Sequence, residues 1–299
     1  MTGPADGWLD RDGISIHYLE WNADPAPRPG RPILLLHGLS SNAHYWDRVA
    51  RHLSPAGPRI VALDQRGHGL TGRPPHAPPV PDGYAMERLI DDAAFAIESL
   101  GLDHPVIAGH SWGATVSLET AARLGDAISA LVFIDGPIEG FANWFSWDEA
   151  QQFMQPPLPR YTSFAQAVDD VRRDFDGAWG DDLEPFVMSR LVQDGSDLVL
   201  TLTAPIRLEL LRGLFESPVD HLWTVLDAPA AVLLAKQGPA AITSRREGGA
   251  KALAKAAPGV EVRWFDTPHD IPVFEPEAIA RELARFSGSD PAAAQKLQD

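Results

Sequence analysis

One short stretch of the chain joins a hydroxyl nucleophile to the glycines that such a nucleophile needs. The segment Gly109-His110-Ser111-Trp112-Gly113 matches the pattern G-x-S-x-G, between an apolar run at 106–108 and a helical pattern at 112–124. In this context the pattern forms a tight turn between a strand and a helix, which holds the serine hydroxyl clear of the backbone. The helix N-terminus favours the negative charge that develops during attack. The sequence therefore predicts Ser111 as a nucleophile.

A nucleophilic serine needs a base, and one of the ten histidines stands in a suitable segment. His269 follows the apolar run 260–265 and precedes a helical pattern that begins near residue 275. A loop at the carboxyl end of a strand is where parallel sheets carry their chemistry. We therefore predict that His269 is the general base that accepts the Ser111 proton.

The elements that must position these residues alternate along the chain. Short, almost purely apolar runs occur at 33–36, 60–63, 106–108, 130–134, 231–234 and 260–265. Such runs are typical of strands that helices cover on both faces. Helical spacing of apolar residues separates several of them, as at 84–100, and an Asp-Gly turn predicts a hairpin over 8–21. The pattern predicts an α/β fold with a doubly wound, mostly parallel sheet.

One long segment breaks the alternation. From 137 to 222 no convincing strand is evident, and aromatic residues are frequent. We expect a helical cap inserted after the sixth strand, over a core formed by 1–136 and 223–287, with 288–299 as a flexible tail. Some cap aromatics should line a substrate pocket while others fill the cap's own core. The pocket residues that we predict are His37, Trp144, Trp147 and Phe153.

Composition narrows the possible partners. The net charge of −16 disfavours binding to nucleic acid or to anionic membranes. The absence of cysteine excludes disulfides and thiolate metal sites. The chain contains no apolar run of roughly 18 residues, as a membrane helix would need, and its start lacks the pattern of a signal peptide. We expect a cytoplasmic protein with a small-molecule substrate, while the oligomeric state stays open.

A glycine pattern after the run 60–63 suggests a nucleotide site but lacks the necessary context. Residues 67–72 match G-x-G-x-x-G, yet the prolines at 74, 75, 78 and 79 prevent the helix that would hold a pyrophosphate. The match is therefore interpreted as accidental. We predict no nucleotide, no cofactor and no metal.

Together these motifs resemble the α/β-hydrolase superfamily, in particular its cap-bearing branch of esterases, lactonases, carbon–carbon bond hydrolases and epoxide hydrolases. The resemblance covers 8–287 and rests on His37-Gly38, on the segment 64–69, on the turn around Ser111 and on the segment around His269. The turn is similar to that of epoxide hydrolases and haloalkane dehalogenases, in which aspartate stands in place of the serine. Ser111 therefore points to an acyl-enzyme rather than an alkyl-enzyme.

The resemblance implies hydrolysis of a carboxylic ester or lactone, and the aromatic-rich cap suggests a largely apolar substrate. Carbon–carbon hydrolysis of a vinylogous diketone and cofactor-free dioxygenation use similar residues and stay as alternatives. A binder with the hydrolase fold but without catalysis is a further alternative.

The acid of the expected catalytic triad departs from the usual pattern. In the family it commonly follows the seventh strand, but the corresponding segment 233–239 contains no carboxylate. Asp135 ends the run 130–134, and some family members take their acid from that strand end. The order Ser111, Asp135, His269 then keeps the superfamily's order of nucleophile, acid and base. Asp135 could instead cap the first turn of the cap, and Glu247 and Asp266 are the weaker rivals.

Two backbone N–H groups should stabilise the oxyanion. The resemblance assigns them to Trp112, which follows the nucleophile, and to Leu39, which follows His37-Gly38. Alternatively, His37-Gly38 is an ordinary turn.

Overall fold

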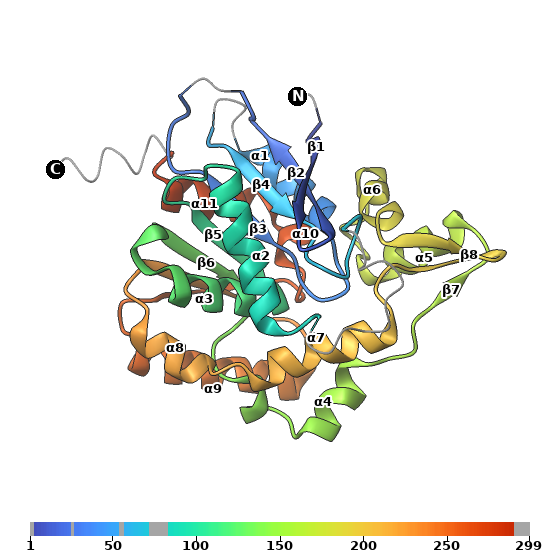
Figure 1. Ribbon diagram of the computed structural model, residues 1–299. Coiled ribbons are helices and arrows are strands. Elements are labelled where there is room, and N and C mark those ends of the chain that lie inside the picture. The colour runs from blue at the N-terminus through green and yellow to red at the C-terminus, as the bar shows by residue number, and fades with distance from the viewer. Residues whose placement is uncertain (1–2, 25–26, 54–56, 72–82, 290–299) are drawn as a thin grey trace.

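The computed structural model describes residues 3–24, 27–53, 57–71 and 83–289 (Figure 1). Its main feature is an eight-stranded sheet in the order β1-β2-β4-β3-β5-β6-β10-β11. The strands are β1 (Ala5–Arg11), β2 (Ile14–Trp21), β3 (Ile33–Leu36), β4 (Ile60–Leu63), β5 (Val106–His110), β6 (Ala130–Ile134), β10 (Ala230–Ala235) and β11 (Glu261–Phe265). From β4 to β11 neighbouring strands are parallel, whereas β1, β2 and β4 pair antiparallel. The predicted α/β class and mostly parallel sheet are therefore confirmed.

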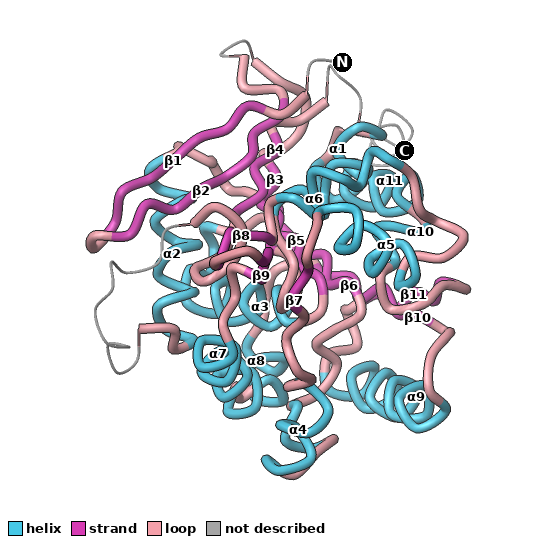
Figure 2. The backbone as a smooth tube through the Cα atoms, turned by 90° about the vertical axis from the view of Figure 1, so that its right-hand side faces the viewer, coloured by secondary structure: helices cyan, strands magenta, loops and turns pink. Residues whose placement is uncertain are grey.

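The antiparallel edge begins with the predicted hairpin. Its turn consists of Asp12 (φ 51°) and Gly13 (φ 78°), which join β1 to β2. Positive φ at both central residues suits the twist of a two-residue hairpin. The hairpin and helix α9 (Ala240–Ala256) lie at opposite ends of the sheet (Figure 2).

Helices cover both faces because strand residues send alternate side chains to opposite sides. In β3, Ile33 and Leu35 join one apolar cluster, while Leu34 and Leu36 join the other. The first face carries α1 (Asp47–His52), α10 (Ile271–Phe274) and α11 (Pro276–Ser287). The second face carries α2 (Met86–Ser99), α3 (Trp112–Leu124), α8 (Val219–Val225) and α9. Short 3-10 helices are η1 (Ala43–Trp46), η2 (Gly125–Ala127), η3 (Phe141–Asn143) and η4 (Asp181–Leu183).

The segment between β6 and β10 contains more than helices. Its helices before α8 are α4 (Trp147–Met154), α5 (Phe164–Asp174), α6 (Glu184–Met188) and α7 (Ala204–Glu216). It also holds a three-stranded antiparallel sheet, formed by β7 (Arg160–Tyr161), β8 (Leu191–Asp194) and β9 (Asp197–Leu200). The segment thus contains the expected helices, but the expectation that it holds no strand is wrong. These strands are too short and too exposed to show a clear alternation in the sequence.

Two expectations concern residues outside this description. The proline-rich stretch after residue 72 falls within 72–82, and most of the predicted tail falls within 290–299. Within the described ranges, no helix has both the length and the apolar character to cross a membrane.

Candidate active site

Ser111 lies between β5 and α3 in a strained backbone conformation, with φ 54° and ψ −118°. Two glycines make this turn possible. A Cβ added at Gly109 would lie 2.3 Å from the Gly113 carbonyl oxygen, and one added at Gly113 would lie 2.3 Å from the His37 carbonyl oxygen. Both contacts are with backbone, which cannot move aside easily. The sequence pattern around Ser111 therefore reflects close packing of strand, turn and helix.

Asp135 follows β6 directly and has a φ of 51°. Its backbone N–H donates to the Leu233 carbonyl over 2.7 Å, and its Oδ1 accepts from the Ala235 N–H over 3.0 Å. Its Oδ2 contacts both the His269 ring and the Arg246 guanidinium. The carboxylate is fully buried, so each of these contacts replaces a lost water.

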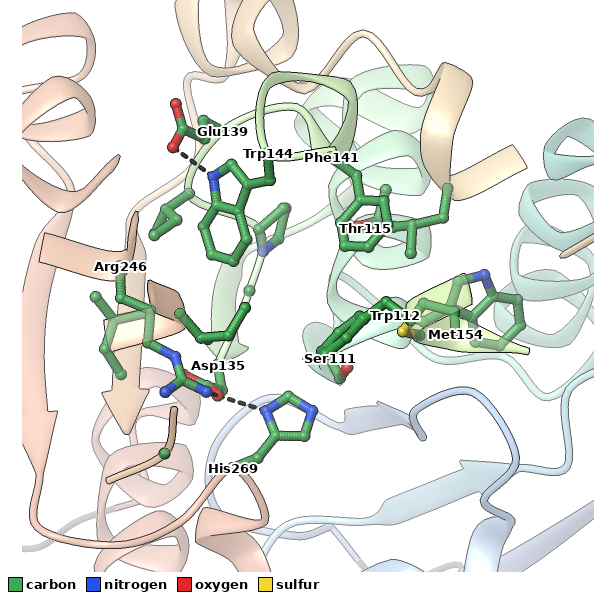
Figure 3. Close-up of a pocket in the computed structure, with 18 of the residues that line it drawn as sticks. Ser111, Trp112, Thr115, Asp135, Glu139, Phe141, Trp144, Met154, Arg246 and His269 are labelled. Atoms are coloured by element: carbon green, nitrogen blue, oxygen red, sulfur yellow. Dashed lines mark hydrogen bonds and ion pairs between the residues drawn. The ribbon is translucent and has the colours of Figure 1, made fainter. Parts of the chain in front are cut away.

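His269 hydrogen-bonds through Nδ1 to Asp135 Oδ2. In Figure 3 its ring lies between Asp135 and Ser111, with the second ring nitrogen turned away from the carboxylate. The described residues include no hydrogen bond between Ser111 and His269; such bonds often tighten only when substrate binds. The structure thus brings Asp135 and His269 into direct contact and places Ser111 beside them.

The loop that carries His269 is fixed from behind. His110 Nε2 donates to the His269 carbonyl over 3.1 Å, and the Tyr45 hydroxyl donates to Asp270 Oδ1 over 3.1 Å. The Tyr45 and His110 rings stack with centroids 4.9 Å apart. These contacts anchor the His269 carbonyl and the Asp270 side chain, next to the ring that faces Ser111.

The charges around His269 favour the protonated form of its ring. Burial would raise the pKa of Asp135, but hydrogen bonding and attraction to His269, together with the Arg246 charge, outweigh this effect and lower it. Desolvation would lower the pKa of His269, but the hydrogen bond and charge of Asp135 outweigh it, so the pKa lies above its ordinary value. An ionised carboxylate therefore stabilises the imidazolium that forms when a serine proton is removed.

The two predicted oxyanion donors both border the cavity beside Ser111. Trp112 is the first residue of α3, so its N–H has no partner within the helix. The loop that contains Leu39 is held at Ser40 (φ 66°), whose N–H donates to His68 Nε2 over 3.0 Å. Burial and the neighbouring His37 lower the pKa of His68 to about 3, so its ring stays neutral and can accept this bond.

A cavity of about 550 Å³ opens beside Ser111 and is walled mainly by apolar side chains. Its described lining beyond the triad and oxyanion residues includes Thr115, Gly136, Pro137, Ile138, Glu139, Phe141, Trp144, Phe145, Phe153, Met154, Leu214, Val219, Leu234, Gln237, Gly238, Pro239, Ile242, Arg246 and Pro268. Trp144 donates through Nε1 to the Glu139 carboxylate, and its ring borders the cavity (Figure 3). The site can thus hold a substrate with considerable apolar area.

Of the four pocket residues predicted from the sequence, Trp144 and Phe153 line the cavity, whereas His37 and Trp147 do not. His37 is fully buried, where its Nε2 accepts from the Gln65 N–H and its Nδ1 donates to the Gly38 carbonyl. Trp147 packs edge-on against Phe215 and beneath Arg212. The structure therefore assigns His37 to the support of the Leu39 loop and Trp147 to the packing between α4 and α7.

Sequence reasoning missed two charged residues that border the cavity, Glu139 and Arg246. Arg246 also contacts Asp135. No local motif marks Arg246, because its partner lies 111 positions away. The rival acids Glu247 and Asp266 are both exposed, and neither contacts His269. Within the described ranges, no group of three or more His, Asp or Glu side chains could hold a metal ion.

Comparison with known proteins places this geometry in context. The sequence model of a family described as "alpha/beta hydrolase fold" matches residues 31–176. Epoxide hydrolase A of Mycobacterium tuberculosis is 29% identical over 46% of this chain. The chain spans only 40%, 32% and 36% of the first three epoxide hydrolases that it matches.

Two longer matches extend over nearly the whole chain. N-formylmaleamate deformylase of Pseudomonas putida is 28% identical over 91% of this chain and 92% of its own length. The crystal structure of E-2-(acetamidomethylene)succinate hydrolase superposes with a TM-score of 0.75 and 21% identity, over 95% of this chain and 98% of that one. At that identity the superposition establishes a shared fold.

Proposed function

Since this chain belongs to the α/β-hydrolase superfamily, we propose that it hydrolyses a carboxylic ester or lactone through an acyl-enzyme on Ser111. The observation that carries the proposal is the contact between the buried Asp135 carboxylate and His269 beside the strained Ser111 turn. A nucleophile, a base and an acid that orients the base are the parts that acyl transfer requires.

The proposed reaction has two halves. His269 Nε2 accepts the Ser111 proton while Oγ attacks the carbonyl carbon, and the Leu39 and Trp112 N–H groups stabilise the oxyanion. The C–O bond then breaks, and the protonated His269 donates its proton to the leaving alkoxide. In the second half a water molecule loses a proton to His269 and attacks the acyl carbon. The bond between that carbon and Ser111 Oγ then breaks, His269 returns the proton to Oγ, and the carboxylic acid is released.

The cavity walls support an apolar substrate. Rings of Phe141, Trp144 and Phe145 and the side chains of Leu214 and Val219 border the space above Ser111. Each apolar group that they take from water stabilises the complex by about 25 cal/mol per Å² of buried surface. We therefore propose an aromatic or aliphatic ester, or the corresponding lactone, as the substrate class.

A second candidate is hydrolysis of an N-acyl bond by the same residues. It is favoured by the match to a protein named as a deformylase over nearly its whole length. The chemistry differs only in the leaving group, an amine that His269 would protonate instead of an alkoxide.

The experiment combines labelling with a substrate panel. We expect a fluorophosphonate to label the protein with one equivalent at Ser111, and Ser111→Ala to abolish both labelling and turnover. Ser99→Ala, at an exposed serine of α2, is the control that should keep both. Failure to label Ser111 in the folded protein would overturn the proposal. The panel should contain aryl esters, alkyl esters, lactones and N-acyl compounds, and preference for the last would favour the second candidate.

A further inference from the structure

Arg246 occupies an unusual place for a cation, at the back of the proposed triad. It comes from the middle of α9, and its side chain is 7% exposed. Its Nη2 contacts Asp135 Oδ2, the same oxygen that contacts His269. In Figure 3 the guanidinium and the His269 ring lie on opposite sides of the Asp135 carboxylate.

A second contact fixes the guanidinium relative to the turn after β10. Arg246 Nη1 donates to the Gln237 carbonyl over 3.2 Å. At Gly238 (φ 142°), a Cβ would lie 3.4 Å from the same Nη1. This turn is where the superfamily commonly carries its acid, and here a buried cation packs against it. The acid on β6 and the cation on α9 therefore form one ion pair across the end of the sheet.

The pairing has a clear physical consequence for Asp135. A fully buried carboxylate tends to gain a proton unless opposite charges and N–H donors stabilise its ionised form. His269 supplies such a charge only while it is protonated, whereas an arginine is charged at every working pH. Arg246 therefore adds to the stabilisation of the ionised Asp135 during the part of the cycle in which His269 is neutral, together with the Ala235 N–H.

We propose that Arg246 is a positioning residue for the reaction, which holds the Asp135 carboxylate toward His269 and keeps His269 in its neutral form. This role rests on the proposed function of Ser111, Asp135 and His269. The role adds to that function, because Arg246 acts through its contact with Asp135 and forms no covalent bond with the substrate.

The charged groups around His269 define the sign of the effect. Asp135 directly after β6 and Asp270 directly before α10 favour the protonated ring, while Arg246 on α9 opposes it. His110 on β5 and Tyr45 on η1 contact the same loop, but His110 has a pKa lowered to about 4 by burial and by His269, so it stays neutral at working pH. Removing the Arg246 charge should therefore raise the pKa of His269 further and leave a smaller fraction of neutral base at pH 7.

The test measures the ionisation of His269 directly and through activity. The imidazole ¹³Cε1 resonance of His269, assigned by its absence in His269→Asn, is titrated in the wild type and in three variants. Arg246→Gln removes the charge but keeps N–H donors for Asp135, and Arg246→Lys keeps the charge. Lys251→Gln removes one charge from an exposed position of the same helix and is the matched control. The pH dependence of kcat/KM for the best aryl ester is measured in parallel.

We expect a wild-type midpoint above 6.5, and an upward shift of roughly one pH unit in Arg246→Gln, as expected for loss of a nearby charge. Arg246→Lys and Lys251→Gln should keep the wild-type midpoint, and the acidic limb of kcat/KM should move with the resonance. An unchanged midpoint in Arg246→Gln would overturn the proposal, as would an equal shift in Arg246→Lys or Lys251→Gln. If no ester is turned over, the proposed function fails, but the resonance still decides whether Arg246 sets the ionisation of His269.

Discussion

The backbone N–H of Ala235 on β10 donates a 3.0 Å hydrogen bond to Oδ1 of Asp135, which directly follows β6. The Asp135 N–H in turn donates to Leu233, also on β10. Because β6 and β10 are neighbouring parallel strands, their carboxyl ends meet at the same edge of the sheet. A carboxylate from either strand can therefore reach the ring of His269. This relation explains how Asp135 can serve as the acid although the segment after β10 contains none.

We expect Asp135→Asn to lower kcat by about 10⁴, because the amide no longer holds the His269 tautomer or stabilises the imidazolium. The substitution keeps the size of the side chain, so circular dichroism should show an intact fold. Activity is measured with the best aryl ester of the panel.

The rival acids serve as controls for this variant. Glu247→Gln and Asp266→Asn change exposed carboxylates that do not contact His269, so both should keep kcat within about twofold of the wild type. A fall of less than tenfold in Asp135→Asn, or a large fall in either control, would remove Asp135 from the proposed triad.

His68→Phe tests the support of the oxyanion loop. The substitution keeps a ring against Trp112, whose centroid lies 5.4 Å from that of His68, but it removes the acceptor of the Ser40 N–H. Since the neighbouring Leu39 N–H is a proposed oxyanion donor, we expect kcat to fall by about 10², close to the loss of one such donor. KM should change little.

The dependence on pH gives this prediction a second readout. The His68 pKa of about 3 means that the ring is a neutral acceptor at every working pH, so the loss should be the same from pH 6 to pH 9. His52→Phe, at an exposed histidine of α1, is the control. If a correctly folded His68→Phe protein kept the wild-type kcat, the His68 ring would have no part in holding the oxyanion loop.

Two glycines of contrasting surroundings test the packing of the serine turn. In Gly109→Ala the new Cβ meets the Gly113 carbonyl and the Ser117 hydroxyl at 2.3 and 2.4 Å, so we expect the free energy of unfolding to fall by about 3 kcal/mol. Gly248→Ala lies in α9 with open space around it, and should raise the free energy of unfolding by up to about 1 kcal/mol. Urea denaturation measures both. Equal stability of the two variants would contradict the close packing at Gly109.

The sequence was most informative where burial is complete. The run 33–36 forms β3 within its predicted bounds, and all four of its side chains are buried, so an uninterrupted apolar pattern was a direct record of a covered strand. The helix predicted over 112–124 also has its expected bounds, since the serine motif fixes its start and Gly125 follows its end. The contacts that determine both segments are reflected in the types of neighbouring residues in the sequence.

Features that depend on distant partners were not predictable in this way. β8 and β9 form a partly exposed hairpin in which only Leu200 is fully buried, so no alternation of buried and exposed positions marks them. Arg246 looks like any helix cation until the fold brings it to Asp135. His37 occupied a plausible pocket position in the sequence, but its ring is turned into the protein to bind Gln65.

The cavity wall begins at the acid itself. Gly136, Pro137, Ile138 and Glu139 follow Asp135 without interruption, and all four border the cavity. Gly136, with φ 152°, also lies against Ser111, since a Cβ there would be 3.3 Å from the Ser111 carbonyl oxygen. Natural variation that reshapes this wall must therefore leave the backbone next to the carboxylate unmoved. Substitutions that alter the substrate range without loss of rate should therefore lie farther along the chain, on α4, α7 and α8. The wall residues there are not sequence neighbours of the reacting groups.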